Sequence, residues 1–219
     1  MRWTKFPLYT LSGYSKVKCY CKKELVAGKV MEIMRKNFGS KPMVYPMPVF
    51  IVASYDENGT PDAMNAAWGG ISEENEISMC LSPDHKTVKN ILKTGFFTVS
   101  MADAAHVKEC DYVGVVSANK VPDKFVKAGF HELKSEFVNA PLIEELPMAL
   151  ECKMKSYDEE SCRMIGEIVN VSADERILDK AGKIDVKKLN PITFDPVNNT
   201  YITLGEKVGK AFCDGLELK

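Results

Sequence analysis

The sequence lacks any long apolar run. Its longest strongly apolar stretch spans residues 49–53, far below the ~20 residues that a membrane-spanning helix needs. The N-terminus is positively charged but has no sustained apolar region, so a secretory signal is not expected. The sequence also lacks an excess of either charge, because 29 basic and 30 acidic residues leave a net charge of −1. This balance gives no sign of nucleic acid or of a basic protein as partner, and the lack of a spanning segment argues against a membrane.

Cysteine usage gives no sign of a disulfide framework. The count of seven is odd, and Cys80, Cys110, Cys152 and Cys162 each sit alone in an apolar segment. Such usage is typical of reduced, buried thiols and predicts a cytoplasmic protein. Cys19 and Cys21 are one residue apart in a polar stretch, but the sequence has no second Cys/His pair at zinc-ligand spacing, which argues against a zinc site.

Histidine is scarce, and the chain has no HExxH motif, which argues against a metal-dependent hydrolase. His106 and His131 lie far from the other motifs and are expected to be structural or solvent-facing. Glu144 and Glu145 are adjacent, so they do not face each other on a helix and are expected on an exposed turn. No metal site and no catalytic side chain are predicted. A GxGxxG motif is also missing, so no Rossmann nucleotide site is expected.

What is present suits one globular domain, with 219 residues, 45% hydrophobic and 27% charged. Residues 1–33 are basic, with scattered apolar positions, and we treat them as an N-terminal extension to a domain over residues 34–219. The extension is interpreted either as a short helix over residues 23–35 or as sequence preceding a native start at Met34.

Short strands dominate the domain. Alternation and β-branched or aromatic residues predict the strands, and polar or Gly-containing segments separate them. We expect strands at residues 46–55, 61–70, 75–81, 96–101, 147–159, 162–174 and 200–209, the fifth and sixth forming a long hairpin. Helices are expected at residues 83–94, with Val88, Ile91 and Leu92 as the apolar stripe, and near 104–112. Strict βαβ alternation is absent, so the pattern favours an antiparallel barrel or sandwich with inserted helices.

The loop SPDHKT, residues 82–87, concentrates polar groups just before the first helix. Ser82 or Asp84 is expected to cap the helix, with a proline in its first turn. Lys86 opposes the helix dipole there by ~0.3–1 kcal/mol, and a bound anion would remove the conflict. His85 and Thr87 add further donors. The alternative, which the residues leave open, is that Asp84 neutralises Lys86 while its neighbours are solvated.

One strand earlier, the sequence NAAWGG offers a second candidate element. Asn65 is followed by the small residues Ala66 and Ala67 and then by Trp68. This order suits close approach of a planar ring system to the backbone. The alternative is a strand that ends in a glycine turn, with Trp68 in the core.

Taken in order, these motifs carry a resemblance. YPMPVFIVASYDENGTPDAMNAAWGG, CLSPDHKT, TGFFTVS, DYVGVVSANKVPDKF, APLIEELPMALECKM and TYITLGEKVGKAF resemble the flavin reductase-like, FMN-binding split-barrel family, and within it the flavoredoxin-like branch. The resemblance covers most of residues 34–212. Ala118 stands where relatives are expected to have glycine, and Lys86 stands where many wider-family members use arginine.

The resemblance implies an antiparallel split β-barrel that forms a homodimer with FMN at the interface. By position, Asn65, Ala66, Ala67 and Trp68 would line the ring system and ribityl chain. The residues that would hold the phosphate are Ser82, His85, Lys86 and Thr87.

The function implied is that of an FMN-dependent oxidoreductase, in which NAD(P)H, as a transient co-substrate, reduces FMN. Electrons would pass on to free flavin, a ferric complex or a protein partner. The alternative is a flavoredoxin-type electron-transfer flavoprotein that does not oxidise NAD(P)H itself. A third interpretation is an FMN-binding protein without turnover.

Overall fold

The computed structural model describes residues 25–26, 29–30 and 34–218. The chain divides into two units, Met1–Lys41 and Pro42–Lys219. Each unit is described by itself. The sequence-based division after residue 33 stays a prediction.

The first unit contains one small β structure. Strands β1 (Leu25–Val26) and β2 (Lys29–Val30) pair in antiparallel fashion. The helix expected over residues 23–35 is therefore wrong at the residues that the structure describes. Its remaining residues, and Cys19 and Cys21, lie outside the described part.

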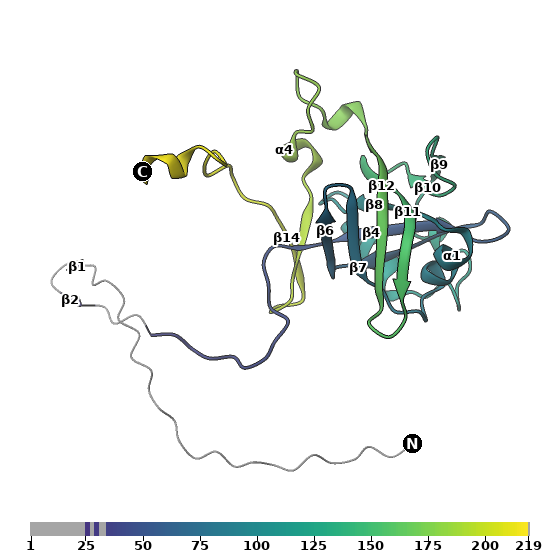
Figure 1. Cartoon of the computed structure of the whole chain (residues 1–219), viewed down its shortest axis with the longest axis horizontal. Helices are drawn as coiled ribbons and strands as arrows, with labels where there is room; N and C mark the ends of the chain where they lie inside the picture. Colours follow the sequence, from purple (N-terminus) through teal and green to yellow (C-terminus); the bar gives the residue numbers. More distant parts are fainter. Residues whose placement is uncertain (1–24, 27–28, 31–33, 219) are drawn as a thin grey trace, which may run out of the picture. The chain divides into compact units, whose positions relative to one another are not determined.

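The second unit is built on a seven-stranded antiparallel sheet with strand order β5-β4-β8-β11-β12-β7-β6 (Figure 1). Its strands, in chain order, are β4 (Phe50–Tyr55), β5 (Pro61–Ala66), β6 (Gly69–Glu73), β7 (Glu76–Cys80), β8 (Phe96–Met101), β11 (Met148–Asp158) and β12 (Arg163–Ala173). Each pairing is antiparallel, which confirms the predicted antiparallel, mainly β fold with inserted helices.

The remaining elements are short. Two small antiparallel sheets consist of β3 (Met47–Pro48), β13 (Ile192–Asp195) and β14 (Thr200–Thr203), and of β9 (Glu132–Lys134) and β10 (Pro141–Ile143). The helices are α1 (Lys86–Thr94), α2 (Val107–Val115), α3 (Lys124–Lys127) and α4 (Val186–Leu189), with 3₁₀ turns η1 (Glu175–Ile177) and η2 (Asp214–Leu218). No helix in the described part of the chain is both long and apolar enough to cross a membrane.

The sheet is buried on both faces at β4, whereas β6 at its far edge is mostly exposed. Successive side chains of a strand point to opposite faces, and in β4 this places Phe50 and Val52 in one core cluster and Ile51 and Ala53 in another. Helix α1 contributes to the first cluster, and α2 and α3 contribute to the second. Because β4 is buried on both faces, its sequence reads as a continuous apolar run.

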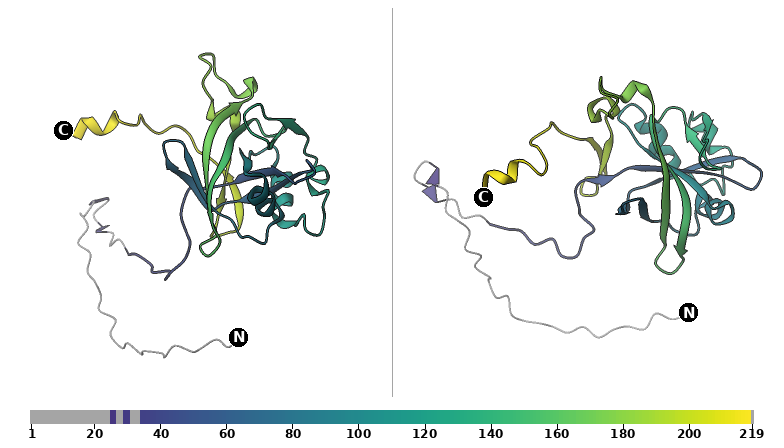
Figure 2. Two further views of the ribbon diagram at one scale, coloured as in Figure 1. Left: turned by 45° about the vertical axis from the view of Figure 1, so that its right-hand side comes forward. Right: turned by 45° about the horizontal axis from the view of Figure 1, so that its top comes forward.

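The β11–β12 hairpin, which lies inside the sheet, curves along its length (Figure 2). Two irregularities in register, between Glu151 and Cys152 and between Met154 and Ser156, accompany the curvature. Bulges of this kind bend a strand and increase its twist. Close packing is visible at Gly166, where an added Cβ would lie 2.3 Å from the Phe97 ring.

Several element boundaries differ from those expected. The strand expected over residues 61–70 is two strands, because the chain leaves β5 after Ala66 and enters β6 at Gly69. Helix α1 buries Thr87, Val88, Asn90 and Ile91 but leaves Leu92 42% exposed. The last strand ends at Thr203, and residues 204–218 are exposed.

Candidate functional site

A cavity of about 190 Å³ lies where the end of β5, the start of α1 and the chain following α2 meet. We call this cavity the α1 pocket. It is lined by Met64, Asn65, His85, Lys86, Thr87, Val113, Gly114, Val115, Val116, Ser117, Ala118 and Lys124. Four of the residues predicted from sequence, Asn65, His85, Lys86 and Thr87, are therefore brought together at one pocket.

The N-terminal end of α1 has no side-chain cap. The helix begins at Lys86, and His85 at the capping position makes no side-chain capping hydrogen bond. The expected caps lie earlier in a turn, where the N–H of Asp84 donates to Ser82 Oγ at 3.4 Å. The predictions of a cap at Ser82 or Asp84 and of a helical Pro83 are therefore wrong.

An uncapped end leaves several backbone donors free. In the part of the chain that the structure describes, the N–H groups of Lys86, Thr87 and Val88 donate to no protein oxygen. The first turn also contains no acidic residue. Free N–H groups, the positive end of the helix dipole and the Lys86 ammonium together favour an anion here.

Thr87 is completely buried, and its hydroxyl has a partner inside the protein. Its Oγ1 donates to Asp62 Oδ2 at 2.6 Å, and its carbonyl accepts from Ser54 Oγ at 3.3 Å. The hydroxyl hydrogen of Thr87 is thus committed to Asp62. The donor that Thr87 offers to the pocket is its backbone N–H.

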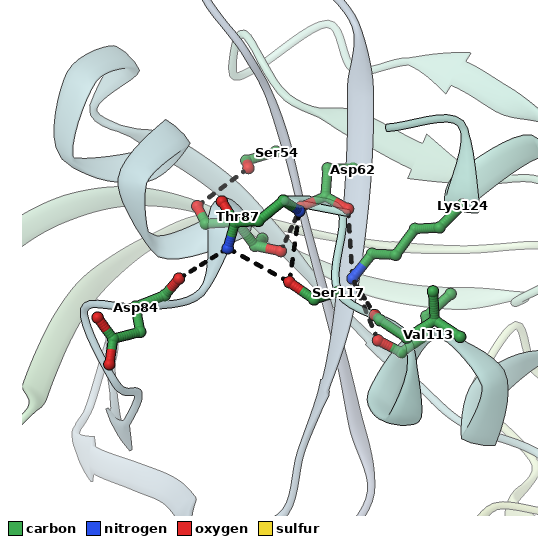
Figure 3. Close-up of polar contacts among 9 residues, drawn as sticks. Ser54, Asp62, Asp84, Thr87, Val113, Ser117 and Lys124 are labelled. Atoms are coloured by element: carbon green, nitrogen blue, oxygen red, sulfur yellow. Dashed lines mark hydrogen bonds and ion pairs between the residues drawn. The ribbon is translucent and has the colours of Figure 1, made fainter. Parts of the chain in front are cut away.

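Behind the pocket wall lies a buried ion pair (Figure 3). The ammonium of Lys124 is 3.4 Å from Asp62 Oδ1, and both side chains are almost completely buried. The same ammonium donates to the carbonyls of Val113 and Val116, at 3.2 and 3.1 Å. Lys124 therefore ties the last turn of α2 and the residue after it to strand β5.

The pKa of Lys124 reflects two opposed effects. Burial lowers it, because an ammonium loses hydration, and the Asp62 carboxylate opposes that shift. Sequence reasoning missed both residues. The available signal was Asp62 itself, since an acidic residue inside an apolar strand is costly to bury without a partner.

The two walls of the pocket are also joined by an amide. Asn119 Nδ2 donates to the carbonyl of Asp84 at 2.9 Å and to Ser117 Oγ at 3.3 Å. One acceptor precedes α1 and the other lies on the opposite wall. Asn119 therefore holds the turn before α1 near the segment that follows α2.

At the β5 end of the pocket, Asn65 is fixed by close contacts. Its Nδ2 donates to the carbonyl of Cys110 at 3.1 Å. An added Cβ at Gly114 would lie 2.9 Å from Asn65 Cβ, so this approach requires glycine.

A further hydrogen bond joins β14 to α2, since Tyr201 OH donates to Asp111 Oδ1 at 2.7 Å. The pKa of Tyr201 is raised, mainly by burial and secondly by this hydrogen bond.

The other predicted site residues, Ala66, Ala67, Trp68 and Ser82, lie outside the pocket lining. Trp68 is 57% exposed, so the alternative that placed it in the core is wrong. It sits between β5 and β6, where the chain leaves one edge strand of the sheet for the other.

Cysteines and histidines outside the pocket are partly as expected. Cys110 and Cys152 are buried, which raises the pKa of each thiol to about 12. Cys80 is exposed, so the expectation of a buried thiol is wrong there. His131 is exposed and pairs with Glu145, at 2.6 Å from ring Nδ1 to Oε1.

Comparisons with known proteins bear on what this site does. A family model described as a flavin reductase like domain matches residues 38–184. Flavoredoxin of Desulfovibrio vulgaris (Miyazaki F) is 37% identical with a TM-score of 0.79, covering 83% of this chain and 100% of that chain. Flavoredoxin from Methanosarcina acetivorans is 27% identical with a TM-score of 0.74, covering 86% and 100%.

A third structure shares the fold alone. The FMN-binding domain of a flavin reductase-like enzyme from Shewanella baltica OS155 is 17% identical with a TM-score of 0.68, covering 74% of this chain and 88% of that chain. Together these matches confirm the predicted resemblance to the flavoredoxin-like branch and the predicted split-barrel fold.

Proposed function

Because the chain belongs to the flavin reductase-like domain family, we propose that it binds FMN and passes electrons through the bound flavin. The phosphate would occupy the α1 pocket. The observation that carries this proposal is the uncapped start of α1, with free N–H groups and Lys86 in its first turn.

The donor set of the pocket fits a phosphate. The lining includes two lysines and a histidine, and none of the lining residues in the described chain is acidic. Lys86, His85 and the N–H groups at the start of α1 would hold the anion. Ser82, one turn earlier, keeps a hydroxyl hydrogen available while its oxygen accepts from Asp84.

The ring end of the flavin would lie along residues 65–68. Ala66 is buried in the first core cluster, whereas the small side chain of half-buried Ala67 would let the ring approach the backbone. The exposed indole of Trp68 offers a flat apolar surface. Asn65 lines the pocket and would mark the junction between the phosphate and ring ends.

FMN, when bound, supplies the hydride and electron chemistry itself. The work of this chain is to bind the cofactor, orient it and limit the access of water. That division explains why a catalytic side chain need not be present at the pocket.

For the source of electrons, two candidates belong to the proposal. One is reduction by NADH or NADPH, acting as a transient co-substrate because the sequence has no GxGxxG nucleotide motif. The other is a flavoredoxin-type carrier that receives electrons from another donor. The two flavoredoxins, at 37% and 27% identity, favour the carrier. The acceptor in either case would be free flavin, a ferric complex or a protein.

The test is an absorbance spectrum of purified protein with FMN, followed under anaerobic conditions by NADH, NADPH and then dithionite. Flavin bands that bleach with nicotinamide would establish a reductase, and bleaching by dithionite alone would support the carrier. A protein that takes up no FMN would contradict the proposal.

A matched pair of variants assigns the phosphate site. Lys86→Gln removes the ammonium at the pocket, and Lys89→Gln makes the same change at an exposed position of the same helix. We expect K86Q to weaken FMN binding by about tenfold, the loss of one charge-assisted contact, and K89Q to leave it within about twofold. Equal affinities would contradict the assignment.

We also propose a homodimer with FMN at its interface. Trp68, Ile71 and Val115 are exposed by 57%, 66% and 73%, an apolar set that a second copy would cover. Light scattering coupled to size exclusion tests this, and a monomer at all concentrations would contradict it. A cytoplasmic location belongs to the same proposal, because exposed Cys80 is a free thiol.

A further inference from the structure

The ion pair between Asp62 and Lys124 contacts the α1 pocket from behind. Lys124 lines the pocket, whereas Asp62 is 4% exposed and does not. Thr87, which lines the opposite wall, donates to the same carboxylate at 2.6 Å. Asp62 is therefore contacted by both walls of a pocket that is proposed to hold an anion.

Lys124 is held largely by the protein itself. Two of its three N–H groups donate to the carbonyls of Val113 and Val116. The ammonium also forms an ion pair with Asp62 Oδ1 at 3.4 Å, an oxygen that accepts no hydrogen bond from the described residues. The positive charge that lines this wall is thus matched by a negative charge behind it. The cation left for an incoming anion is Lys86, supported by the N–H groups at the start of α1.

Without Lys124, the balance of charge at the pocket would reverse. The Asp62 carboxylate would keep its hydrogen bond from Thr87 but would lose its cation. An uncompensated carboxylate that is itself buried beside the pocket repels a phosphate strongly, because the low dielectric around it screens the charge little. A ligand without a phosphate would meet no such repulsion.

We infer that Lys124 is a positioning and specificity-determining residue, which cancels the charge of Asp62 so that the α1 pocket accepts the phosphate of FMN. It sets the preference for FMN over riboflavin, which shares the ring system and ribityl chain but has no phosphate. The inference rests on the proposed function, since it concerns the site assigned there to the phosphate.

The experiment measures the affinities of apoprotein for FMN and for riboflavin by flavin fluorescence. The variants are Lys124→Met, the double variant Asp62→Asn with Lys124→Met, and the control Lys127→Met. Lys127 is on the same short helix as Lys124, but it is exposed and pairs with Asp123 on the surface. K127M makes the same chemical change without touching Asp62.

We expect K124M to weaken FMN binding by about 30-fold and riboflavin binding by less than about threefold, because only the phosphate meets the unpaired charge. The double variant, D62N/K124M, removes both charges and should bind FMN within about threefold of the unchanged chain. K127M should leave both affinities within about twofold.

Loss of both ligands to the same degree in K124M would overturn the inference, because it would mark Lys124 as merely structural. So would an unchanged FMN affinity in K124M. Should K124M fail to fold, the double variant decides, since weak FMN binding by a folded D62N/K124M chain would also overturn it. Failure of the unchanged chain to bind FMN would contradict the proposed function instead.

Discussion

Two carboxylates in the main sheet, Asp62 on β5 and Glu151 on β11, are 4% and 1% exposed, but their partners are of different kinds. Asp62 faces the ammonium of Lys124 and the hydroxyl of Thr87. Glu151 accepts hydrogen bonds from neutral groups, the hydroxyl of Ser135 and the Asn170 amide, the latter at 2.7 Å.

The contrast follows from where each carboxylate lies. Asp62 is contacted by two residues that line the α1 pocket, so an unpaired charge there would act on any anion in the pocket. In the described part of the chain, neither side-chain partner of Glu151 lines the pocket, and Glu151 instead fixes the segment after β9 against β11 and β12. Asp62 is therefore paired with a cation where its electric field would act on a ligand in the pocket. For Glu151, which only holds segments of the chain together, neutral hydrogen-bond donors suffice.

The largest effect is expected from breaking the ion pair. Asp62→Ala leaves the Lys124 ammonium buried without its carboxylate, which should lower the free energy of unfolding by about 3–5 kcal/mol. Glu151→Ala leaves two neutral donors unpaired and should cost about 1–3 kcal/mol. Urea unfolding of the apoprotein measures both. Equal losses would show that the cation makes no difference to stability.

A smaller loss of stability is expected when the hydrogen bond from Thr87, in the pocket wall, to Asp62 is removed. Thr87→Val keeps the shape of the side chain but removes the donor to a charged acceptor, at an expected cost of about 1.5–3 kcal/mol. Thr94→Val is the matched control, because that hydroxyl donates to the neutral carbonyl of Asn90 four residues earlier in the same helix. A loss at T94V as large as that at T87V would contradict a special role for the contact with Asp62.

Much of this fold was predictable because its signals are local. The alternation over residues 75–81 and the apolar β4 run depend on the faces that each strand buries, which the order of residues records directly. The start of α1 was not predictable in this way. Ser82 and Asp84 suit a capping position by residue type, but the turn before Lys86 commits Ser82 Oγ to Asp84.

Part of the site was predictable from the sequence, and part of it was not. Lys86 stood out as a cation at the unfavourable end of a helix, and the structure places it at the pocket. Lys124 gave no comparable signal, because its partner Asp62 is far away in sequence and α3 is only four residues long. Contacts between distant residues depend on how the chain is folded, and no periodicity along the sequence encodes them.

A milder substitution at Glu151 tests whether its uncharged partners influence the pocket at all. Glu151→Gln keeps one acceptor oxygen and the side-chain shape, so it should lower the free energy of unfolding by only about 0.5–1.5 kcal/mol. FMN affinity should stay within about twofold, since neither Glu151 nor its partners Ser135 and Asn170 are among the described residues that line the pocket. A larger loss of FMN binding in E151Q would mean that the two carboxylates are coupled across the sheet.

The smallest effect concerns Glu145, which is near the surface and pairs with His131. The hydrogen bond to Glu145 raises the pKa of His131 above its ordinary value of 6.5. Protonated His131 is therefore stabilised in the folded chain, so its contribution is complete below pH 6.5 and is lost as pH rises through the raised value. His131→Gln should remove this pH dependence. Urea midpoints of both chains from about pH 5.5 to about pH 8.5 measure it, and they should converge toward the alkaline end. Parallel plots of urea midpoint against pH for the two chains would show that the pair of His131 and Glu145 adds nothing to stability. Solvent screening can reduce an exposed ion pair to that extent.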